Sequence, residues 1–238
     1  MKKVADLKIK MFADGADKKG MLEMYKKSYI KGFTTNPTLM KKAGIKDFKA
    51  FSLDILKAIP DRPVSLSVFS DDIKEMEKEA LEISSWGKNV YVKIPITNTK
   101  GEGSYGLIER LSKKGVNLNV TAMLSLKQVQ GVADAVKNNV SCFVSVFAGR
   151  VADTGVDPVV LMTEAMKIIK PYKKMELLWA SPRELLNIFQ ADDIGCHIIT
   201  ATNDILKKLE LVGKDLDEYS LETVKMFHND SVESGYKI

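Results

Sequence analysis

Eight short apolar segments recur along the chain, and each is followed by a stretch whose apolar residues have helical spacing. The apolar segments cover residues 9–12, 32–35, 64–69, 90–96, 118–124, 142–147, 176–180 and 196–200. They are almost continuously apolar, which is typical of parallel strands covered by helices on both faces. Between them, residues 71–85 show the helical pattern most clearly, because Ile73, Met76, Ala80 and Ile83 fall on one face. Strand and helix are therefore predicted to alternate throughout.

Eight strand-helix units in 238 residues match a (β/α)8 barrel, which typically needs about 250 residues. A doubly wound open sheet also alternates strand and helix. However, no glycine-rich phosphate loop follows the first apolar segment. We therefore predict an α/β fold, a single TIM barrel domain over residues 1–238. Residues 216–238 are predicted to form a C-terminal amphipathic helix that would cover a barrel face or a neighbouring subunit.

Composition excludes several classes of protein. Lysine and arginine total 36 against 31 acidic residues, and the net charge of +5 is spread over many short clusters, which argues against a nucleic-acid partner. Cys142 and Cys196 lie in apolar segments without metal-ligand spacing, so no disulfide scaffold or zinc module is expected. No segment has the length of a signal peptide core or a membrane span. The sequence predicts a cytoplasmic protein with no membrane partner.

Polar residues stand at the carboxyl end of nearly every apolar segment. In a TIM barrel these ends converge on the active site, so the sequence predicts a polar cavity there. The candidates are Asp14, Thr34, Thr35, Asn36, Ser65, Ser67, Lys93, Asn119, Thr121, Ser145, Arg150, Ser181, Arg183, Thr200 and Thr202.

Lys93 interrupts the apolar run V-Y-V-K-I-P-I, where a buried ammonium costs several kcal/mol. Burial lowers the pKa of a lysine and yields the free amine that attacks a carbonyl to form a Schiff base. The alternative is a lysine that extends from the strand end to solvent. Asp14 closes the first segment, and its carboxylate could remove a proton from a substrate hydroxyl and drive carbon-carbon cleavage. Asp14 could instead cap the next helix, as Asp17 could.

Six motifs occur in order over almost the whole chain: F-A-D at 12–14, G-F-T-T-N-P-T-L at 32–39, V-K-I-P-I-T at 92–97, N-V-T at 119–121, S-V-F-A-G-R at 145–150 and A-S-P-R at 180–183. Together they resemble the transaldolase family, which includes the short fructose-6-phosphate aldolases. The resemblance implies a TIM barrel, class I aldol chemistry on ketose phosphates, no cofactor and no metal, and a homo-oligomer.

Taken position by position, the resemblance makes Lys93 the Schiff-base lysine and Asp14 the group that takes the proton from the C4 hydroxyl of the donor. The residues that it places around the sugar are Thr34, Asn36, Asn119, Ser145, Phe147 and Ser181. Arg150 and Arg183 match a phosphate clamp, since two guanidinium groups on adjacent loops can hold a dianion by forked hydrogen bonds. A surface ion pair is the alternative for either arginine.

Two positions separate this chain from its relatives. Ser67 stands where the family has a glutamate or glutamine, which together with the threonine matched by Thr121 positions a catalytic water. Phe147 stands where the aldolases have tyrosine, as it does in transaldolases. The loop over residues 97–106, just beyond Lys93, is longer than expected and would either contact the sugar or only decorate the rim.

We therefore expect an enzyme that transfers a dihydroxyacetone unit between sugar phosphates through Lys93. One alternative is an aldolase that releases free dihydroxyacetone or that acts on another sugar phosphate in biosynthesis. The other is a catalytically silent barrel that binds a sugar phosphate.

Overall fold

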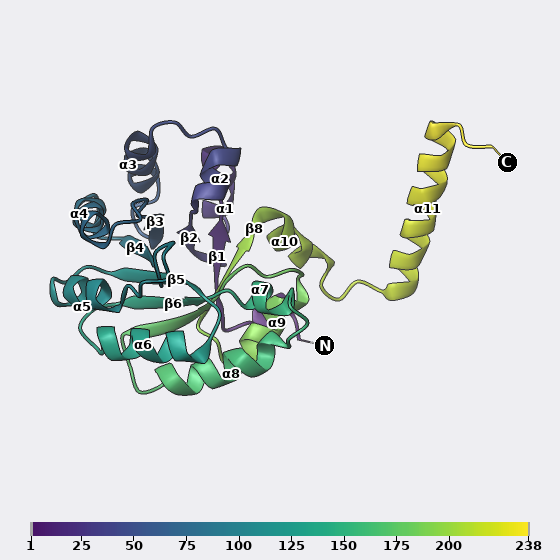
Figure 1. Ribbon diagram of the computed structural model, residues 1–238. Coiled ribbons are helices and arrows are strands. Elements are labelled where there is room, and N and C mark those ends of the chain that lie inside the picture. The colour runs from purple at the N-terminus through teal and green to yellow at the C-terminus, as the bar shows by residue number, and fades with distance from the viewer. Residues whose placement is uncertain (1, 238) are drawn as a thin grey trace.

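The computed structural model describes residues 2–237 and shows eight parallel strands closed into a barrel in sequence order (Figure 1). The strands are β1 (Lys10–Asp14), β2 (Ile30–Thr34), β3 (Val64–Ser67), β4 (Val90–Pro95), β5 (Leu118–Met123), β6 (Cys142–Val146), β7 (Met175–Trp179) and β8 (Ile198–Thr202). Each predicted strand is present, with ends that differ by one or two residues in most cases. The predicted TIM barrel is confirmed.

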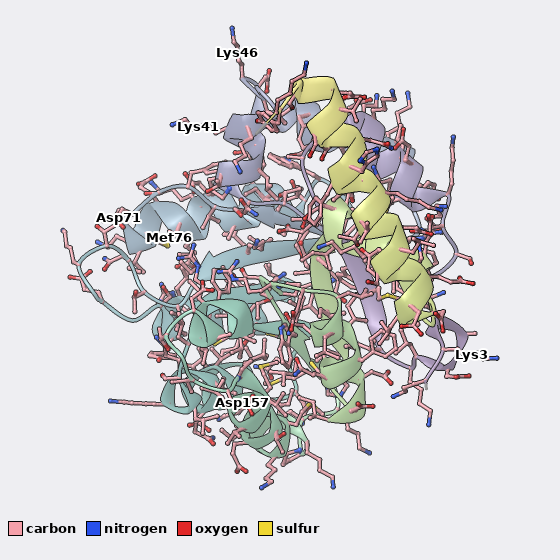
Figure 2. The ribbon with its side chains drawn as sticks, turned by 90° about the vertical axis from the view of Figure 1, so that its right-hand side faces the viewer. Lys3, Lys41, Lys46, Asp71, Met76 and Asp157 are labelled. Atoms are coloured by element: carbon pink, nitrogen blue, oxygen red, sulfur yellow. The ribbon has the colours of Figure 1, made fainter. Side chains whose placement is uncertain are left out.

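Helices follow the strands, and all except the last of them surround the barrel (Figure 1). They are α1 (Lys18–Tyr25), α2 (Pro37–Lys42), α3 (Phe48–Ala58), α4 (Ile73–Ser84), α5 (Tyr105–Lys113), α6 (Leu126–Val136), α7 (Ala148–Ala152), α8 (Pro158–Ile169), α9 (Leu186–Asp193), α10 (Asn203–Lys207) and α11 (Leu216–Ser234), with 3-10 turns η1 (Val4–Asp6) and η2 (Lys208–Leu211). Charged side chains such as Lys41 and Lys46 point outward, whereas Met76 of α4 is buried (Figure 2).

The short helices α2 and α7 are not predicted by hydrophobic periodicity. Each follows a strand directly and precedes the longer covering helix of the same unit. Because both start at the carboxyl end of the barrel, they bring additional residues to the edge where polar side chains converge.

An aromatic layer fills the barrel beneath its carboxyl end. The Phe12 and Phe143 rings meet edge to face with centroids 5.5 Å apart, and Tyr91 stacks on Phe143 at 3.9 Å. Side chains on a strand point to the same face every second residue, so each ring lies directly below an inward polar residue. The pairs are Phe12 and Asp14, Tyr91 and Lys93, and Phe143 and Ser145. The aromatic layer therefore forms the floor of any cavity above it.

Helix α11 stands away from the barrel (Figure 1) and contains no buried residue. The predicted C-terminal helix is thus confirmed as a helix, but it does not cover a face of its own barrel. Residue 238 of the predicted extension, like residue 1, lies outside the described residues. Within residues 2–237, no helix has the length and apolar character needed to cross a membrane.

Gly32 is required by the aromatic floor. A methyl group added at Gly32 would lie 2.5 Å from the nearest atom of the Phe12 ring, which is 1% exposed and held by Phe143. Gly32→Ala should therefore lower the free energy of unfolding by about 1–3 kcal/mol, the usual cost of overpacking, as measured by urea denaturation. Gly106→Ala is the matched control, since a methyl there meets only the end of Arg110 at 3.6 Å within a helix. Equal stability of the two variants would show that the floor can rearrange.

Candidate active site

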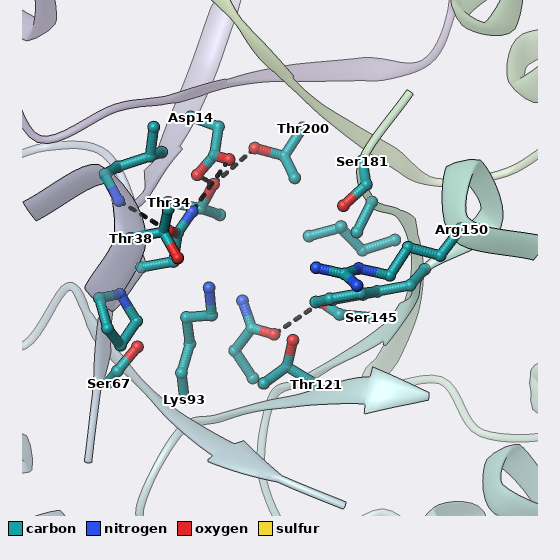
Figure 3. A pocket seen from close by; sticks show the side chains of 17 residues that line it. Asp14, Thr34, Thr38, Ser67, Lys93, Thr121, Ser145, Arg150, Ser181 and Thr200 are labelled. Atoms are coloured by element: carbon teal, nitrogen blue, oxygen red, sulfur yellow. Dashed lines mark hydrogen bonds between the residues drawn. The ribbon is translucent and has the colours of Figure 1, made fainter. Parts of the chain in front are cut away.

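A cavity of about 410 Å³ opens at the carboxyl end of the barrel (Figure 3). It is lined by Asp14, Thr34, Asn36, Pro37, Thr38, Leu39, Ser67, Lys93, Asn119, Thr121, Ser145, Phe147, Arg150, Leu178, Ala180, Ser181 and Thr200. Of the candidate residues predicted from the sequence, all except Thr35, Ser65, Arg183 and Thr202 are on this wall. The structure therefore brings together side chains from all eight strands, or from the loops and short helices that follow them.

Lys93 projects inward from the middle of β4 and is 9% exposed. In the strand register it lies between Ser67 of β3 and Asn119 of β5. Its Nζ donates a hydrogen bond of 2.6 Å to the carbonyl oxygen of Thr35. Burial lowers the pKa of Lys93, and the nearby Asp14 opposes this shift only in part. The side chain therefore ends inside the cavity and favours the free amine.

Asp14 ends β1 and points into the same cavity (Figure 3). One carboxylate oxygen, Oδ1, accepts a hydrogen bond of 2.7 Å from the Thr34 hydroxyl, and Oδ2 accepts one of 3.4 Å from the Asn36 amide. Burial raises the pKa of Asp14, while Lys93 and these two bonds partly offset the rise. Asp17 is the residue that caps α1, through a bond of 2.8 Å from Gly20 N. Asp14 is therefore not needed as a helix cap.

Thr200 extends the hydrogen-bonded chain at Asp14. The Thr34 and Thr200 hydroxyl oxygens are 2.6 Å apart. A hydroxyl has one proton, and Thr34 gives its proton to Asp14, so Thr200 must be the donor to Thr34. The sequence pattern includes Thr200 among the strand-end residues but assigns it no role. Its inward position on β8, beside β1, is the property that could have indicated one.

A second hydrogen-bonded chain fixes the Asn119 amide. Ser145 donates to Asn119 Oδ1 at 2.6 Å, and Asn119 Nδ2 donates to the Ser65 hydroxyl at 2.9 Å. All three side chains are buried. Since both ends of the amide are engaged, its orientation is fixed beside Lys93 before any ligand arrives.

Thr121 lies at an irregularity of β5. Val120 of β5 pairs with Val144 of β6, and the next pair is Met123 with Val146. The step is three residues on β5 but two on β6, so β5 contains a β-bulge. Ala122 adopts a φ of 64°, in the left-handed region. The bulge leaves the Thr121 hydroxyl buried with no hydrogen-bond partner among the described residues. This hydroxyl lines the cavity and is available to a ligand or a water molecule.

Asn36 and α2 form one wall of the cavity. Asn36 Oδ1 accepts a bond of 2.9 Å from Leu39 N and so caps α2, while its amide nitrogen faces Asp14. Pro37 occupies the first turn of the helix. An asparagine followed by proline is a recognised helix start, and this signal could have predicted both α2 and the presence of Thr38 in the cavity.

The two predicted phosphate ligands differ in position. Arg150 is on α7, not on a loop, and its guanidinium lies 5.7 Å from the centroid of the Phe147 ring at the cavity wall. Arg183 instead forms a two-pronged ion pair with Asp153, with Nε bonded to Oδ1 at 2.9 Å and Nη2 bonded to Oδ2. Only Arg150 therefore reaches the cavity directly.

Gly149 brings α7 against the chain that follows β7. A methyl group at Gly149 would lie 1.6 Å from the carbonyl oxygen of Ser181, whose own φ is 57°. Only glycine permits this approach, which places Arg150 and Ser181 on one wall.

The loop over residues 97–106 does not line the cavity. Thr97 pairs with Gly103 in an antiparallel bridge, and Thr99 is bonded to Asp71 through both its amide and its hydroxyl. The loop is folded on itself and on the start of α4. The interpretation that it decorates the rim is therefore the one that fits this structure.

Residues 11–238 match the family described as Transaldolase/Fructose-6-phosphate aldolase. The chain belongs to this family. A probable transaldolase of Dehalococcoides mccartyi is 35% identical over 204 residues, covering 84% of this chain and 90% of the relative. A probable transaldolase of a Thermoanaerobacter species is 32% identical over 231 residues, covering 97% of this chain and 100% of the relative. The predicted family is confirmed, and the chain is a transaldolase-like enzyme.

Solved structures with low sequence identity support the fold alone. Orotidine 5'-monophosphate decarboxylase from Metallosphaera sedula superposes with a TM-score of 0.56 at 12% identity, over 88% of this chain and 98% of that one. 3-Keto-L-gulonate-6-phosphate decarboxylase from Vibrio cholerae superposes with a TM-score of 0.53 at 10% sequence identity, over 82% of this chain and 88% of that one. In residues 2–237, no cluster of three or more His, Cys, Asp or Glu side chains is arranged to hold a metal ion.

The buried amine of Lys93 should reduce stability. Its pKa in the folded protein is below the ordinary 10.5, so between that lowered pKa and about 10.5 the folded state binds fewer protons than the unfolded chain. This penalty is fully present below the folded pKa and disappears as the pH rises through about 10.5. Lys93→Met should therefore raise the melting temperature at pH 7, by an amount that shrinks towards pH 10.5, as measured by circular dichroism. The exposed Lys46→Met is the control; a Lys93→Met protein that melts below wild type would show that the bond to Thr35 outweighs burial.

Proposed function

We propose that this enzyme transfers a dihydroxyacetone unit from a ketose phosphate to an aldose phosphate through a Schiff base on Lys93. The observation that carries the proposal is a buried lysine amine of lowered pKa that shares one polar cavity with a single carboxyl group, Asp14. A deprotonated amine adds to a ketone, and the resulting iminium ion can accept the electron pair of a neighbouring carbon-carbon bond.

The cleavage step uses Asp14. Its carboxylate takes the proton of the C4 hydroxyl, the C3–C4 bond breaks, and the electron pair moves into the iminium group to form an enamine. The aldehyde leaves, and the enamine then attacks an aldose phosphate in the reverse sequence. Thr34 and Asn36 both donate to Asp14 and so hold its carboxylate at the cavity wall.

The sugar would be held by groups that are already oriented. Asn119 and Ser145 are fixed by their mutual hydrogen bond, and amides and hydroxyls offer both donors and acceptors to a polyol. Phe147 contributes an apolar wall and the Ser181 hydroxyl points into the cavity (Figure 3). Thr121 and Ser67 provide hydroxyls near Lys93 that could hold a water molecule. These roles are proposals for each residue.

The phosphate of the substrate is proposed to bind at Arg150. Arg183 would contribute only after leaving Asp153. That ion pair is about half exposed, and such pairs are usually worth about 0–1 kcal/mol, so a phosphate dianion could compete for Arg183. Arg150 is therefore the main ligand, and Arg183 an additional one.

Release of free dihydroxyacetone is the second candidate function. Release of free dihydroxyacetone requires both protonation of the enamine carbon and an activated water. Neither Ser67, which pairs with Lys93 in the register, nor Phe147 adds a second titratable group for these two steps. Transfer to an aldehyde needs no such water at that stage, so it remains the main proposal. A transfer of this kind belongs to carbohydrate metabolism such as the pentose phosphate pathway, and the cytoplasmic location stays a prediction from the sequence.

The enzyme is also proposed to be a homo-oligomer. Helix α11 exposes large apolar side chains, among them Leu221, Val224, Phe227 and Val232, each at least half exposed. Burial of such a surface is favourable. A second copy of the chain is the partner that we propose for it.

Schiff-base formation can be tested by borohydride reduction in the presence of fructose 6-phosphate, followed by mass analysis of peptides. Wild type should carry a reduced three-carbon adduct on Lys93. Lys93→Met should lose both the adduct and turnover, because methionine keeps the length of the side chain and removes the amine. The exposed Lys46→Met should behave as wild type. An adduct on another lysine, or turnover by Lys93→Met above about a tenth of wild type, would refute the proposal.

The phosphate site can be tested with Arg150→Ala. Loss of a charge-assisted bond should weaken the binding of phosphorylated substrates by about 2 kcal/mol, which is roughly a 30-fold increase in KM. Turnover of the unphosphorylated acceptor glyceraldehyde should stay almost unchanged. Arg183→Ala should have a smaller effect of the same kind. Arg110→Ala, which removes a surface ion pair with Glu77, is the control. Equal losses on both acceptors would indicate that Arg150 maintains structure instead.

A further inference from the structure

We propose that Asp14 carries every proton transfer in the cavity: it protonates the hydroxyl that leaves when the Lys93 carbinolamine becomes an iminium ion, and it also acts in carbon-carbon cleavage. This inference deepens the proposed function and rests on Lys93 being the Schiff-base amine. It assigns to one carboxyl group two chemically different steps.

The lining of the cavity leaves Asp14 as the only candidate. Of the described side chains on its wall, only Asp14, Lys93 and Arg150 are ionisable. The Lys93 nitrogen is consumed in the covalent bond, and an arginine guanidinium does not release its proton in proteins. The remaining side chains are hydroxyls, amides or apolar groups, which do not exchange protons near neutral pH. A general acid must therefore be Asp14.

The strands and the loop next to Lys93 supply no second acid. Its register partners are Ser67 and Asn119. In the loop that follows β4, the Glu102 carboxylate accepts a bond of 2.7 Å from Asn98 and is exposed outside the cavity. Asp71 is engaged by Thr99 in the same region. Both carboxylates are thus bound to the loop, and neither residue lines the cavity.

The hydrogen bonds of Asp14 indicate which oxygen holds the proton. Oδ1 accepts the short bond of 2.7 Å from Thr34, whose hydroxyl is itself supplied by Thr200. Oδ2 has only the long bond of 3.4 Å from Asn36. A carboxylic acid keeps its proton on the oxygen that is less strongly engaged, which is Oδ2. Because Asp14 lines the cavity, a proton on this oxygen can pass to a ligand.

Burial favours the protonation states that the first step needs. It raises the pKa of Asp14 and lowers that of Lys93, so both shifts favour a carboxylic acid beside a free amine. The amine is the nucleophile for the ketone carbon, and the acid is the proton source for the departing oxygen.

The steps balance. The amine adds to C2 while Asp14 gives its proton to the carbonyl oxygen; the Asp14 carboxylate then takes one proton from the nitrogen, which leaves a neutral carbinolamine and restores the acid. Asp14 then protonates that hydroxyl, the C–O bond breaks, water leaves with the electron pair, and the nitrogen lone pair forms the iminium ion beside the Asp14 carboxylate. In cleavage the carboxylate takes the C4 hydroxyl proton while the iminium becomes an enamine. Amine with acid, iminium with carboxylate and enamine with acid all have zero net charge, so no stage leaves an uncompensated buried charge.

Dihydroxyacetone isolates the first step, because this ketone has no bond that the enzyme can cleave. Asp14→Asn should form the borohydride-trapped adduct on Lys93 at least tenfold more slowly than wild type in a rapid-quench experiment. Loss of the Asp14 charge can only lower the pKa of Lys93 further, so a slower reaction cannot come from protonation of the amine. Trapping at the wild-type rate would overturn the inference. Absence of the adduct in wild type as well would instead refute the proposed function.

A second acid placed beside Lys93 should restore formation of the iminium ion but not carbon-carbon cleavage. Ser67 faces the cavity in register with Lys93, so Ser67→Glu in the Asp14→Asn background puts a carboxyl group there. This double variant should trap dihydroxyacetone at least tenfold faster than Asp14→Asn, without recovering cleavage of fructose 6-phosphate. Ser67→Gln in the same background is the matched control of equal size, and melting curves confirm folding. Equal trapping by the Glu and Gln variants would contradict a role in proton supply.

Discussion

The alternation of side chains along the closed barrel determines which residues share the cavity. On each strand every second residue points inward, and the parallel register sets Lys93 between Ser67 and Asn119 at one height. A slip of β4 by one residue would turn Lys93 outward among the helices and place Ile94 in the cavity. The surroundings of the amine are therefore set by pairing with other strands, not by the sequence next to it. The aromatic layer below supports this arrangement by excluding water from the lower barrel.

Because the register turns Lys93 and Asp14 into the barrel, their burial lowers the stability of the fold but favours the reactive forms of both groups. Lys93 and Asp14 are both desolvated, and the described residues show no direct ion pair between them, since Nζ bonds instead to the Thr35 carbonyl. A close ion pair would hold both groups charged. Separation within one cavity leaves each group closer to its neutral form, in which an amine is nucleophilic and a carboxyl group can donate a proton.

Much of the site could be predicted from the sequence because the eight apolar segments locate the strand ends. Asp14 and Thr34 end their strands, whereas Lys93 and Asn119 stand out as polar residues inside apolar segments. The fold follows from the same pattern of segments. Hydrophobic periodicity could not reveal α7, which is five residues long and so shorter than two helical turns. Arg150 was consequently expected on a loop.

Other features depend on contacts between distant segments. The pairing of Arg183 with Asp153 joins residues 30 positions apart, and either arginine alone could equally have reached the cavity. The bulge that leaves the Thr121 hydroxyl without a partner among the described residues arises from the mismatch between β5 and β6, and nothing in N-V-T-A-M marks it. The hydrogen bond between Thr200 and Thr34 forms only in the closed barrel, because closure places β8 and β2 on the two sides of β1.

The charges of the site are separated in a way that matches a ketose phosphate. Inside the barrel, Lys93 and Asp14 form a pair with no net charge in their favoured states, while the exposed Arg150 places a permanent positive charge at the mouth on α7. A ketose phosphate carries its carbonyl near one end and its dianion at the other, so it can present the carbonyl to Lys93 while the phosphate stays at the rim. Binding energy gained at Arg150 is then available to hold the carbonyl against the amine. In the proposed complex the phosphate charge would stay outside the buried part of the cavity, where it would disturb the proton balance between Lys93 and Asp14.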